Sequence, residues 1–488
     1  MTRLSLLGLA LAGLCGCAQV QLPALPLGKP PVDPNKPLYD AYFQGPAANR
    51  DNIARFTQDS LQLQKKALGV APDAQIDDYL NGVLARLQRG LPGTPPAARV
   101  YATPNTEFSG ASYQDGGIYI PYKVLETLES EDELAALIGH EYAHVALGHY
   151  ATNWINTAST LAYSAGNLYI NDKLKTATEK NLVGMVLANN AALNVSQIGL
   201  VPALTRDQEE QADRLGSDLL IRAGYSYVGM MNFMSRMQDW DARNQAINEQ
   251  RRVNYIDLFA NRKDNLLANA IDTQIDGLEN QLAGLLRKAA RNHDEGRDRS
   301  KMLRDYLKQH YAGAERPALN QAGYAAVLKS AHAQAFFGGL DQAHAALAAL
   351  QGNERAQALA GASAASKGPA ASVPLVRHAL INAMALNGKP RDALQMLEGD
   401  VAGGDALFAD NLLLLGVLKQ HSPQQALALA QRSYDRYDGS PELLPELILL
   451  NKQMNNQLGV MKFYGLCASK AMVGANNGLL QSCNKAKG

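Results

Sequence analysis

The segment LIGHEYAHVALGH, from Leu137 to His149, contains the residues whose types and spacing are best suited to chemistry. Its apolar residues recur at helical spacing, which predicts a helix that begins near Ser130. On such a helix His140 and His144 lie about 40° apart around the axis, because successive residues rotate by roughly 100°. Both imidazoles then point the same way and could bind one divalent ion. A buried helix that merely contains histidines is the alternative.

A catalytic zinc centre needs a third protein ligand, with one position left for water. His149 is a poor candidate, because on a continuing helix it would be rotated roughly 140° away from His144. We expect it to have a structural role at the helix end. A later helix, predicted to begin near Thr205, carries Glu209 and Asp213 four residues apart on one face. Glu209 would complete a His-His-Glu site and Asp213 could orient an imidazole, although a solvated acidic face has the same pattern.

Two short strands are predicted before the histidine helix. Arg99–Ala102 is typical of a strand, and a glycine turn leads into the second strand. Pro121 lacks an N–H group, which is typical of a strand end or of an edge strand. An edge strand can hold an extended peptide by main-chain pairing. The candidate substrate-binding residues are Gly117, Ile118, Tyr119 and Ile120.

The N-terminus resembles a bacterial lipoprotein signal. Arg3 and a short apolar run precede Leu14-Cys15-Gly16-Cys17, in which Cys17 is the residue that would be lipidated. The run is too short to span a bilayer, and the Pro-rich stretch that follows is typical of a tether. Ala18 after the cysteine implies the outer membrane. An ordinary signal peptide of a secreted protein is the alternative.

Cysteine usage agrees with an oxidising compartment. The chain has 4 cysteines. With the signal removed and Cys17 lipidated, Cys467 and Cys483 form an even pair, which favours a disulfide. Two buried free thiols are the alternative.

Composition indicates a globular protein that does not bind nucleic acid. Of 488 residues, 47% are hydrophobic and 19% are charged, and the 46 basic residues balance the 46 acidic ones. Because no basic block stands out, the electrostatic footprint of a nucleic-acid-binding protein is missing.

Five regions are expected. They are 1–17, a lipoprotein signal peptide; 18–50, a Pro-rich tether; 51–270, the domain of the candidate site; 271–316, a charged helical connector; and 317–488, an Ala/Leu-rich helical repeat domain. In the last region Ala393 and Ala426 each open a helix after a turn, at a spacing near the 34-residue period of tetratricopeptide (TPR) repeats. Such arrays bind partners or peptides in a concave groove. A plain helical bundle is the alternative.

His140-Glu141-Tyr142-Ala143-His144, followed by Glu209 and Asp213 in a Glu-x-x-x-Asp frame, resembles the gluzincin metallopeptidases of the HtpX, CAAX prenyl protease and BepA family. The long membrane spans of some relatives are missing, so the chain is most similar to the periplasmic BepA branch, whose members carry a C-terminal repeat domain. The resemblance implies a mainly α, α+β fold. A zincin-like metalloprotease domain with a small sheet would be followed by a TPR-like α-helical solenoid.

The resemblance also implies roles for the candidate residues. His140, His144 and Glu209 would bind one Zn²⁺ per chain, and Glu141 would be the general base. Asp213 would accept a hydrogen bond from a ligating imidazole without contacting the metal. The Thr-His-Pro element of related sequences is missing, and its nearest equivalent is Ala260-Asn261-Arg262. Neither Arg206 nor Tyr225 is selected by the sequence as the residue that stabilises an oxyanion.

Two functions from different classes are consistent with these features. The first is a zinc metalloendopeptidase of the bacterial cell envelope that acts in protein quality control and outer-membrane protein assembly. It would be lipid-anchored in the periplasm, at the outer membrane, and would cleave protein or peptide substrates. Its TPR-like domain would contact the assembly machinery. The second is a non-catalytic TPR scaffold or chaperone-like lipoprotein with a closed or vestigial metal site.

Overall fold

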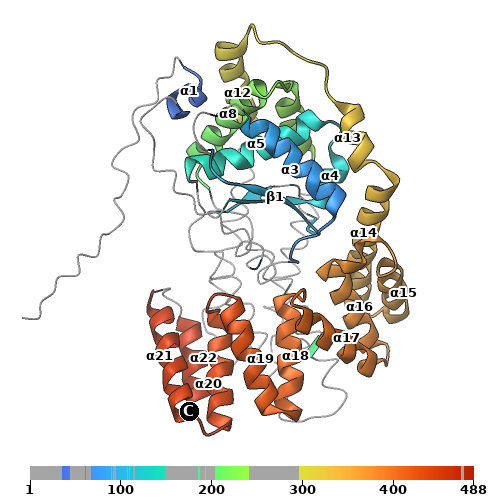
Figure 1. Ribbon diagram of the computed structural model, residues 1–488, viewed down its shortest axis with the longest axis vertical. Coiled ribbons are helices and arrows are strands. Elements are labelled where there is room, and N and C mark those ends of the chain that lie inside the picture. The colour runs from blue at the N-terminus through green and yellow to red at the C-terminus, as the bar shows by residue number, and fades with distance from the viewer. Residues whose placement is uncertain are drawn as a thin grey trace, which may run out of the picture.

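Figure 1 shows the chain as a computed structural model. The structure describes residues 36–43, 61, 68–89, 91, 95–106, 108, 110–113, 116–149, 185–186, 189, 193, 204–240, 296–473 and 477–488. The predicted signal peptide with Cys17, most of the predicted tether and Ala260-Asn261-Arg262 lie outside these residues.

The described part is mainly helical with one three-stranded sheet, which confirms the predicted fold class at that level. Helices and a sheet in the N-terminal part surround the histidine helix, and a stack of helices forms the C-terminal tail (Figure 1). None of the described helices is long and apolar enough to cross a membrane. The elements of the N-terminal part are α1 (Leu38–Phe43), α3 (Ala74–Gln88), β1 (Arg99–Thr103), β2 (Ala111–Ser112), β3 (Gly117–Pro121), α4 (Tyr122–Thr127), α5 (Glu131–Leu147), α8 (Arg206–Arg222) and α12 (Gly296–Tyr311).

The sheet corrects one prediction. Its order is β1-β3-β2, with β3 parallel to β1 and antiparallel to β2. The strand predicted to be an edge, Gly117–Ile120, therefore lies in the centre, and all residues of β3 are buried. Strand β2 is an edge strand, as is β1. The sequence did not predict β2, because two residues are too few to show an alternating pattern. Gly116, at φ 90°, makes the turn that folds β2 back onto β3.

Helix α5 begins and ends as local sequence signals require. The Ser130 side chain accepts a hydrogen bond from the Glu133 N–H at 3.2 Å, which is the N-cap bond expected of serine. The Glu133 carboxylate reaches back one residue further than in a capping box and accepts from the Glu129 N–H at 3.0 Å. Gly148 ends the helix in the left-handed region, at φ 68°.

Helix α8 crosses α5 where each helix has a glycine. A Cβ atom on Gly216 would lie 2.9 Å from the His140 backbone nitrogen, and one on Gly139 would lie 3.2 Å from the Gly216 carbonyl oxygen. The two backbones are therefore almost in contact at this point. Thr205 and Gln208 form a complete capping box at the start of α8. The cap and the crossing together place Glu209 one turn into α8, facing the histidines.

Helices α1 and α12 both pack on the far half of α8 through the buried carboxylate of Asp218. It accepts hydrogen bonds from the Tyr39 N–H at 2.8 Å and from the hydroxyls of Tyr306 and Tyr311 at 2.9 and 2.8 Å. The predicted tether (18–50) and the predicted connector (271–316) thus each contain a helix that packs against α8. Both helices support the candidate site and do not simply link regions.

The tail is a succession of helices, and whether they form TPR-like repeats stays a prediction. Successive helices pack on each other from α14 to α22 (Figure 1). Cys467 and Cys483 form a disulfide that joins α21 to α22. The tail contains α13 (Gln321–Leu328), α14 (Ala331–Gln351), α15 (Arg355–Ala365), the 3₁₀ turn Pro369–Ser372, α16 (Pro374–Leu386), α17 (Pro390–Gly403), α18 (Phe408–His421), α19 (Pro423–Arg436), the 3₁₀ turn Pro441–Leu443, α20 (Leu444–Gln453), α21 (Gln457–Val473) and α22 (Asn477–Lys487).

Helix α14 attaches the tail to the N-terminal part. The Tyr122 hydroxyl donates to the Asp341 carboxylate at 2.7 Å, and Lys123 lies 2.6 Å from the same carboxylate. His344 Nε2 lies 2.6 Å from the Pro104 carbonyl oxygen, and its ring stacks on Tyr122. These contacts connect the tail to residues at the ends of β1 and β3, the strands above the histidine helix.

The crossing of α5 and α8 predicts the effect of a single methyl group. We expect Gly216→Ala to lower the free energy of unfolding by about 1–3 kcal/mol, because the new Cβ must push the two backbones apart. Chemical denaturation monitored by circular dichroism measures this change. Gly82→Ala, in α3, is the matched control, since nothing lies within 4 Å of its added Cβ. Equal stability of the two variants would contradict the prediction.

Candidate metal centre

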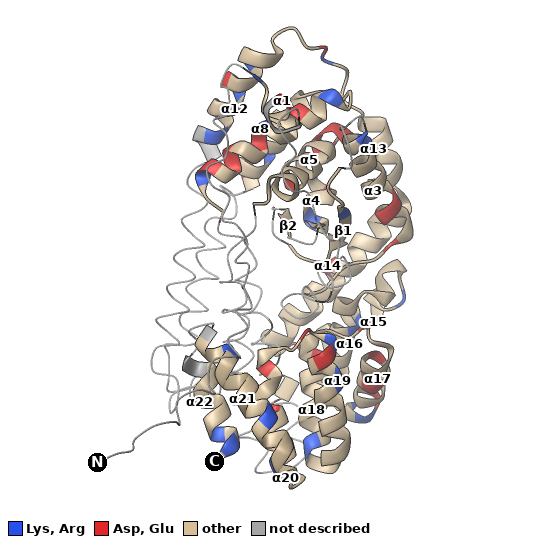
Figure 2. Cartoon of the chain, turned by 60° about the vertical axis from the view of Figure 1, so that its left-hand side comes forward, with Lys and Arg blue, Asp and Glu red and all other residues tan. Residues whose placement is uncertain are grey.

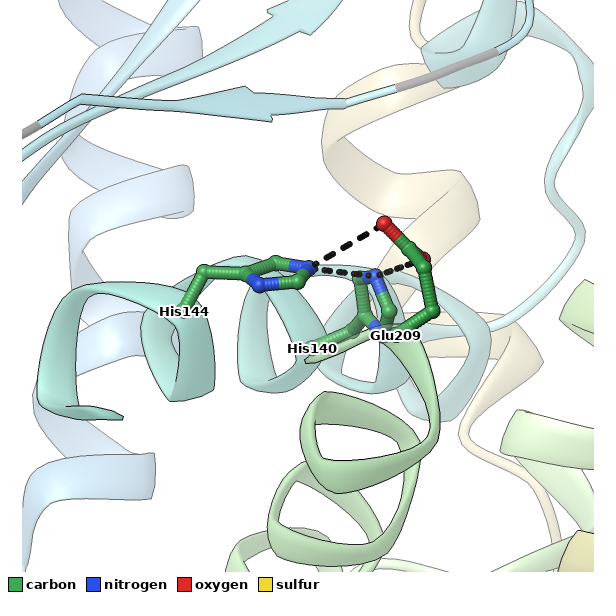
Figure 3. A group of neighbouring side chains, drawn as sticks. All are labelled: His140, His144 and Glu209. Atoms are coloured by element: carbon green, nitrogen blue, oxygen red, sulfur yellow. Dashed lines mark hydrogen bonds and ion pairs between the residues drawn. The ribbon is translucent and has the colours of Figure 1, made fainter. Parts of the chain in front are cut away.

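The residues predicted to bind a metal come together in the structure. His140 Nε2 and His144 Nε2 are 3.2 Å apart (Figure 3). The Glu209 carboxylate oxygens lie 3.5 Å from His140 Nε2 and 3.8 Å from His144 Nε2. One potential ligand atom from each residue lies within 4.8 Å of the others. The two histidines come from α5 and the glutamate from α8, as the sequence predicted.

This donor set fits a zinc ion. Zinc prefers nitrogen and carboxylate oxygen ligands at about 2.0–2.2 Å in a tetrahedron, so adjacent ligand atoms should be about 3.3–3.5 Å apart. The separations of 3.2 and 3.5 Å around His140 Nε2 agree with that geometry. The side chain of Glu209 is 24% exposed whereas that of His144 is 2% exposed. An ion or a substrate would therefore approach past the glutamate.

The second nitrogen of each imidazole also has a partner. Asp213 Oδ1 lies 2.9 Å from His140 Nδ1, in the orienting position predicted for it. His149 Nδ1 lies 3.2 Å from His144 Nδ1. On a continuing helix His149 would be rotated away from His144. Helix α5 instead ends at Gly148, and the chain turns back toward His144. Both contacts direct the Nε2 atoms of the two rings toward Glu209.

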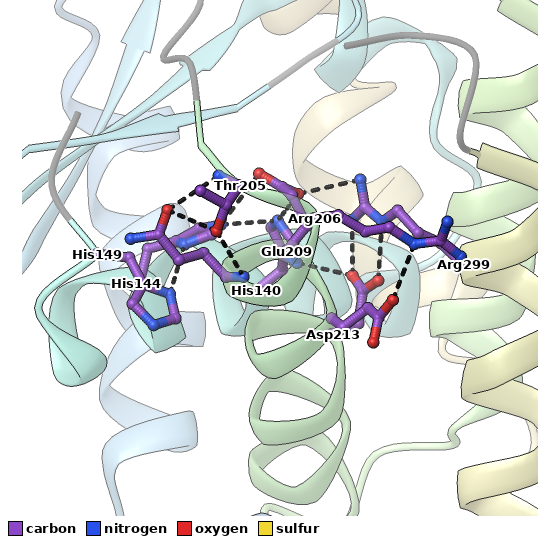
Figure 4. A network of polar contacts seen from close by, with 10 residues as sticks. His140, His144, His149, Thr205, Arg206, Glu209, Asp213 and Arg299 are labelled. Carbon is purple, nitrogen blue, oxygen red and sulfur yellow. Dashed lines mark hydrogen bonds and ion pairs between the residues drawn. The ribbon is translucent and has the colours of Figure 1, made fainter. Parts of the chain in front are cut away.

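Arg299, in α12, is a site residue that sequence reasoning missed. Its guanidinium donates to both carboxylate oxygens of Asp213 at 2.9 and 3.0 Å, and its Nη1 lies 3.0 Å from Glu209 Oε2 (Figure 4). It stands 86 residues after Asp213, in a charge-rich helix where no motif distinguishes it from other arginines. Arg299 supplies positive charge to the carboxylates of buried Asp213 and partly buried Glu209, which would otherwise repel each other.

Neither residue considered for oxyanion stabilisation points into the centre. Arg206 pairs with Glu210 at 3.1 Å along the exposed side of α8. The Tyr225 hydroxyl donates to Glu131 at 2.9 Å, at the opposite end of α5 from His144. The described residues thus assign the oxyanion contact to neither of them.

The charges around the histidines favour a cation at the centre. Burial opposes the charged form of His140, but hydrogen bonds to Asp213 and Glu209 outweigh burial and raise the pKa of His140 to about 10. Burial and the neighbouring His140 lower the pKa of His144 to about 3. Burial also opposes the charged form of Glu209, yet His140 and Arg299 hold the pKa of Glu209 well below its usual range. The group therefore carries two ionised carboxylates, Asp213 and Glu209, which face protonated His140 and the Arg299 guanidinium.

Glu141 lies beside the ligands and against the edge strand. Burial, together with the Glu209 charge, raises the pKa of Glu141 to about 7, although His140 acts in the opposite direction. The Ser112 side chain, in β2, hydrogen bonds to this carboxyl group. A Cβ atom on Gly110 would lie 2.6 Å from Glu141 Oε1, so the backbone before β2 passes directly over the carboxyl group. A carboxyl group with a pKa near neutrality can both accept and return a proton.

Two histidines one turn apart on one helix and a glutamate from a second helix form the ligand arrangement of gluzincin metallopeptidases. Peptidase family M48 matches residues 71–289. Residues 71–289 are therefore a peptidase family M48 domain, which contains all three candidate ligands and Glu141. The resemblance read from the motifs is confirmed over this region. Arg299 lies beyond it.

Named relatives match about a third or more of the chain at low identity. The beta-barrel assembly-enhancing protease of Yersinia pestis is 22% identical over 177 residues, which cover 34% of this chain and 34% of that protein. That of Escherichia coli O157:H7 is 22% identical over 178 residues, 35% of each chain. Metalloprotease YcaL of Escherichia coli strain K12 is 21% identical over 202 residues, 41% of this chain and 74% of that protein. The chain thus spans about a third of the length of the beta-barrel assembly-enhancing proteases that it matches.

The variant Asp213→Asn tests whether the contact of Asp213 with His140 Nδ1 contributes to zinc binding. An amide cannot replace the ionised carboxylate that accepts from His140 and Arg299, so we expect zinc affinity to fall about 10- to 100-fold. Competition with a chromophoric chelator measures the affinity. Asp207→Asn removes the same charge from the exposed first turn of α8 and should leave affinity unchanged. Unaltered zinc binding by Asp213→Asn would show that Asp213 does not support the ligand.

Proposed function

We propose that this protein is a zinc-dependent endopeptidase that holds one Zn²⁺ through His140, His144 and Glu209. The observation that carries the proposal is the convergence of these three side chains within a peptidase family M48 domain. Glu141 is the general base, because it is the buried carboxyl group next to the ligands with a pKa near 7. Asp213 and His149 orient the two imidazoles, and Arg299 balances the charge of Asp213 and Glu209.

The chemistry follows from this placement. A bound zinc ion supplies Lewis acidity that polarises the scissile carbonyl and makes water more acidic. Glu141 removes a proton from the water as the water oxygen attacks the carbonyl carbon. The same carboxyl group then delivers that proton to the amine nitrogen as the C–N bond breaks. Burial raises the pKa of Glu141 above its usual value, which favours this carboxyl group as a proton acceptor.

We assign the substrate contact to β2 and no longer to β3, where the sequence predicted it. Strand β3 is paired on both sides, whereas β1 and β2 are edge strands, and Ser112 of β2 hydrogen bonds to Glu141. Ala111 and Ser112 are half-buried, so part of this edge reaches solvent. An extended peptide added to β2 would pass over the metal centre and would be held mainly by main-chain hydrogen bonds. This mode of binding accepts many sequences, which suits an enzyme for misfolded or misassembled proteins.

The proposed setting is the bacterial cell envelope. Its support is the lipobox-like segment that ends at Cys17 and the homology to proteins named beta-barrel assembly-enhancing protease. We place the protein in the periplasm, attached to the outer membrane through lipidated Cys17. There it would act in quality control and assembly of outer-membrane proteins. The helix pairs of the tail would form a TPR-like solenoid that recruits substrate or the assembly machinery.

Glu141→Gln tests the catalytic proposal. The amide fills the same volume but cannot accept the proton of the attacking water, so we expect casein digestion to fall by at least about 100-fold. Zinc content, measured by atomic absorption on the same preparation, should stay at one per chain, because Glu141 is not a ligand. Glu210→Gln, which removes a charge from α8 beside Arg206, is the matched control. Full proteolysis by the Glu141 variant would end the proposal.

Gly110→Ala tests the approach of the strand to the general base. Its Cβ would lie 2.6 Å from Glu141 Oε1, so either the carboxyl group or the start of β2 must move. Displacements of this size in an active site cost about 100-fold in rate, which is the loss of kcat that we expect while zinc stays bound. Gly399→Ala, whose Cβ meets nothing within 4 Å, controls for the added methyl group. Activity equal to that of the parent protein would refute this role of Gly110.

A further inference from the structure

The outer face of α21 is apolar. Among the described residues, the exposed large hydrophobic side chains all belong to this helix: Leu458 is 81% exposed, Met461 70%, Met472 74% and Leu466 36%. Leu458, Met461 and Met472 fall within about 60° of arc around the helix axis. A helix face in contact with water normally presents polar side chains, so this face differs from what solubility alone requires.

Lysines border the apolar residues. Lys462 and Lys470 are exposed and lie along one side of the same helix. The charge is one-sided beyond α21 as well, because the sequence from Leu447 to Gly488 contains lysines and no acidic residue. Blue segments mark these lysines along α21 and α22 in Figure 2. We call the set Leu458, Met461, Lys462, Leu466, Lys470 and Met472 the α21 strip.

The strip belongs to a helix that is held in place on its other side. Phe463, Cys467 and Ala471 are buried against the neighbouring helices. The disulfide from Cys467 to Cys483 and the hydrogen bond from the Tyr464 hydroxyl to Asn484, at 2.7 Å, tie α21 to α22. The apolar side chains are thus presented outward by a supported helix and are not the loose end of the chain.

We propose that the α21 strip docks the tail on an anionic membrane surface. Leucine and methionine side chains that protrude from a helix can enter the boundary between headgroups and acyl chains. The lysine stems lie beside them, and their ammonium groups can reach anionic headgroups. The absence of acidic residues from Leu447 onward suits a surface that is negative over a wide area. The surface would be that of a bilayer containing phosphatidylglycerol or a similar anionic lipid.

Two other occupants fit less well. A second copy of this chain, related by a twofold axis, would bring Lys462 and Lys470 close to the same lysines and would add like-charge repulsion. An acidic patch on a protein partner would require lysines on this protein only beside the α21 strip. The one-sided charge instead continues through Lys485 and Lys487 on α22. The docking proposal does not depend on the metal centre or on its activity.

Vesicle sedimentation tests the proposal. A chain produced from Ala18 to Gly488, without Cys17, carries no acylated cysteine, so binding by a lipid anchor cannot contribute. We expect it to sediment with vesicles of phosphatidylethanolamine and phosphatidylglycerol at 3:1, and not with phosphatidylcholine vesicles. Binding should weaken as salt rises, because the lysine contribution is screened. Equal binding to both kinds of vesicle would overturn the proposal.

Variants separate the strip from general charge. Leu458→Gln, Met461→Gln and Met472→Gln together should abolish detectable binding. Lys462→Gln with Lys470→Gln should weaken it about fivefold per lysine removed. Lys308→Gln with Lys389→Gln removes two exposed lysines elsewhere and should leave binding unchanged. Circular dichroism and casein digestion check that each variant is folded. Equal loss of binding in both lysine pairs would overturn the proposal.

Further outcomes identify a different occupant. A dimer seen by light scattering without vesicles, and lost in the triple glutamine variant, would assign the strip to a second copy. Crosslinking of the strip to an envelope protein, with no vesicle binding, would assign it to a protein partner. Either result would overturn the membrane proposal. Loss of proteolysis in Glu141→Gln, with vesicle binding retained, would leave the membrane proposal intact.

Discussion

The close crossing of α5 and α8 is the constraint on which the candidate site depends. The histidines and the glutamate are separated by a long stretch of sequence and have no local reason to meet. They meet because Gly139 and Gly216 allow the two backbones to touch, at a position directly beside His140. A short carboxylate side chain such as Glu209 can span only a few ångströms to the imidazoles. A larger residue at the crossing would push α5 and α8 apart. The distances from the Glu209 carboxylate to the two imidazoles would then be too long for one ion.

Charge balance is the second constraint, and it explains why α12 belongs to the site. Glu209, Asp213 and Glu141 are carboxyl groups in a largely buried volume, and burying them without counter-charge would be costly. Arg299 meets two of them, and the tyrosines of the same helix bind Asp218 further along α8. One helix thus secures both halves of α8. Helix α12, which lies within the predicted connector, is a structural part of the centre.

The sequence predicted features that depend on local spacing and failed where tertiary structure decides. His140 and His144 on one face, Glu209 and Asp213 on another, and the cap at Ser130 all follow from helical periodicity. The place of β3 in the sheet could not be read from Pro121, because β2 is too short to leave a pattern. The ring of His149 returns to His144 only because Gly148 reverses the chain. Arg299 has no sequence signal at all, since its role exists only once α12 packs on α8.

Net charge illustrates the same limit on a larger scale. A formal charge of zero excludes a broad electrostatic attraction to nucleic acid, but it is an average over the whole chain. The acidic groups at the metal centre are buried and matched by histidine and arginine, so they contribute little to the outer surface. No acidic residue follows Leu447 in the sequence, and Lys462 and Lys470 are exposed on α21. A chain with no net charge can therefore present a strongly basic end, and only the fold shows that this end also carries the exposed apolar side chains.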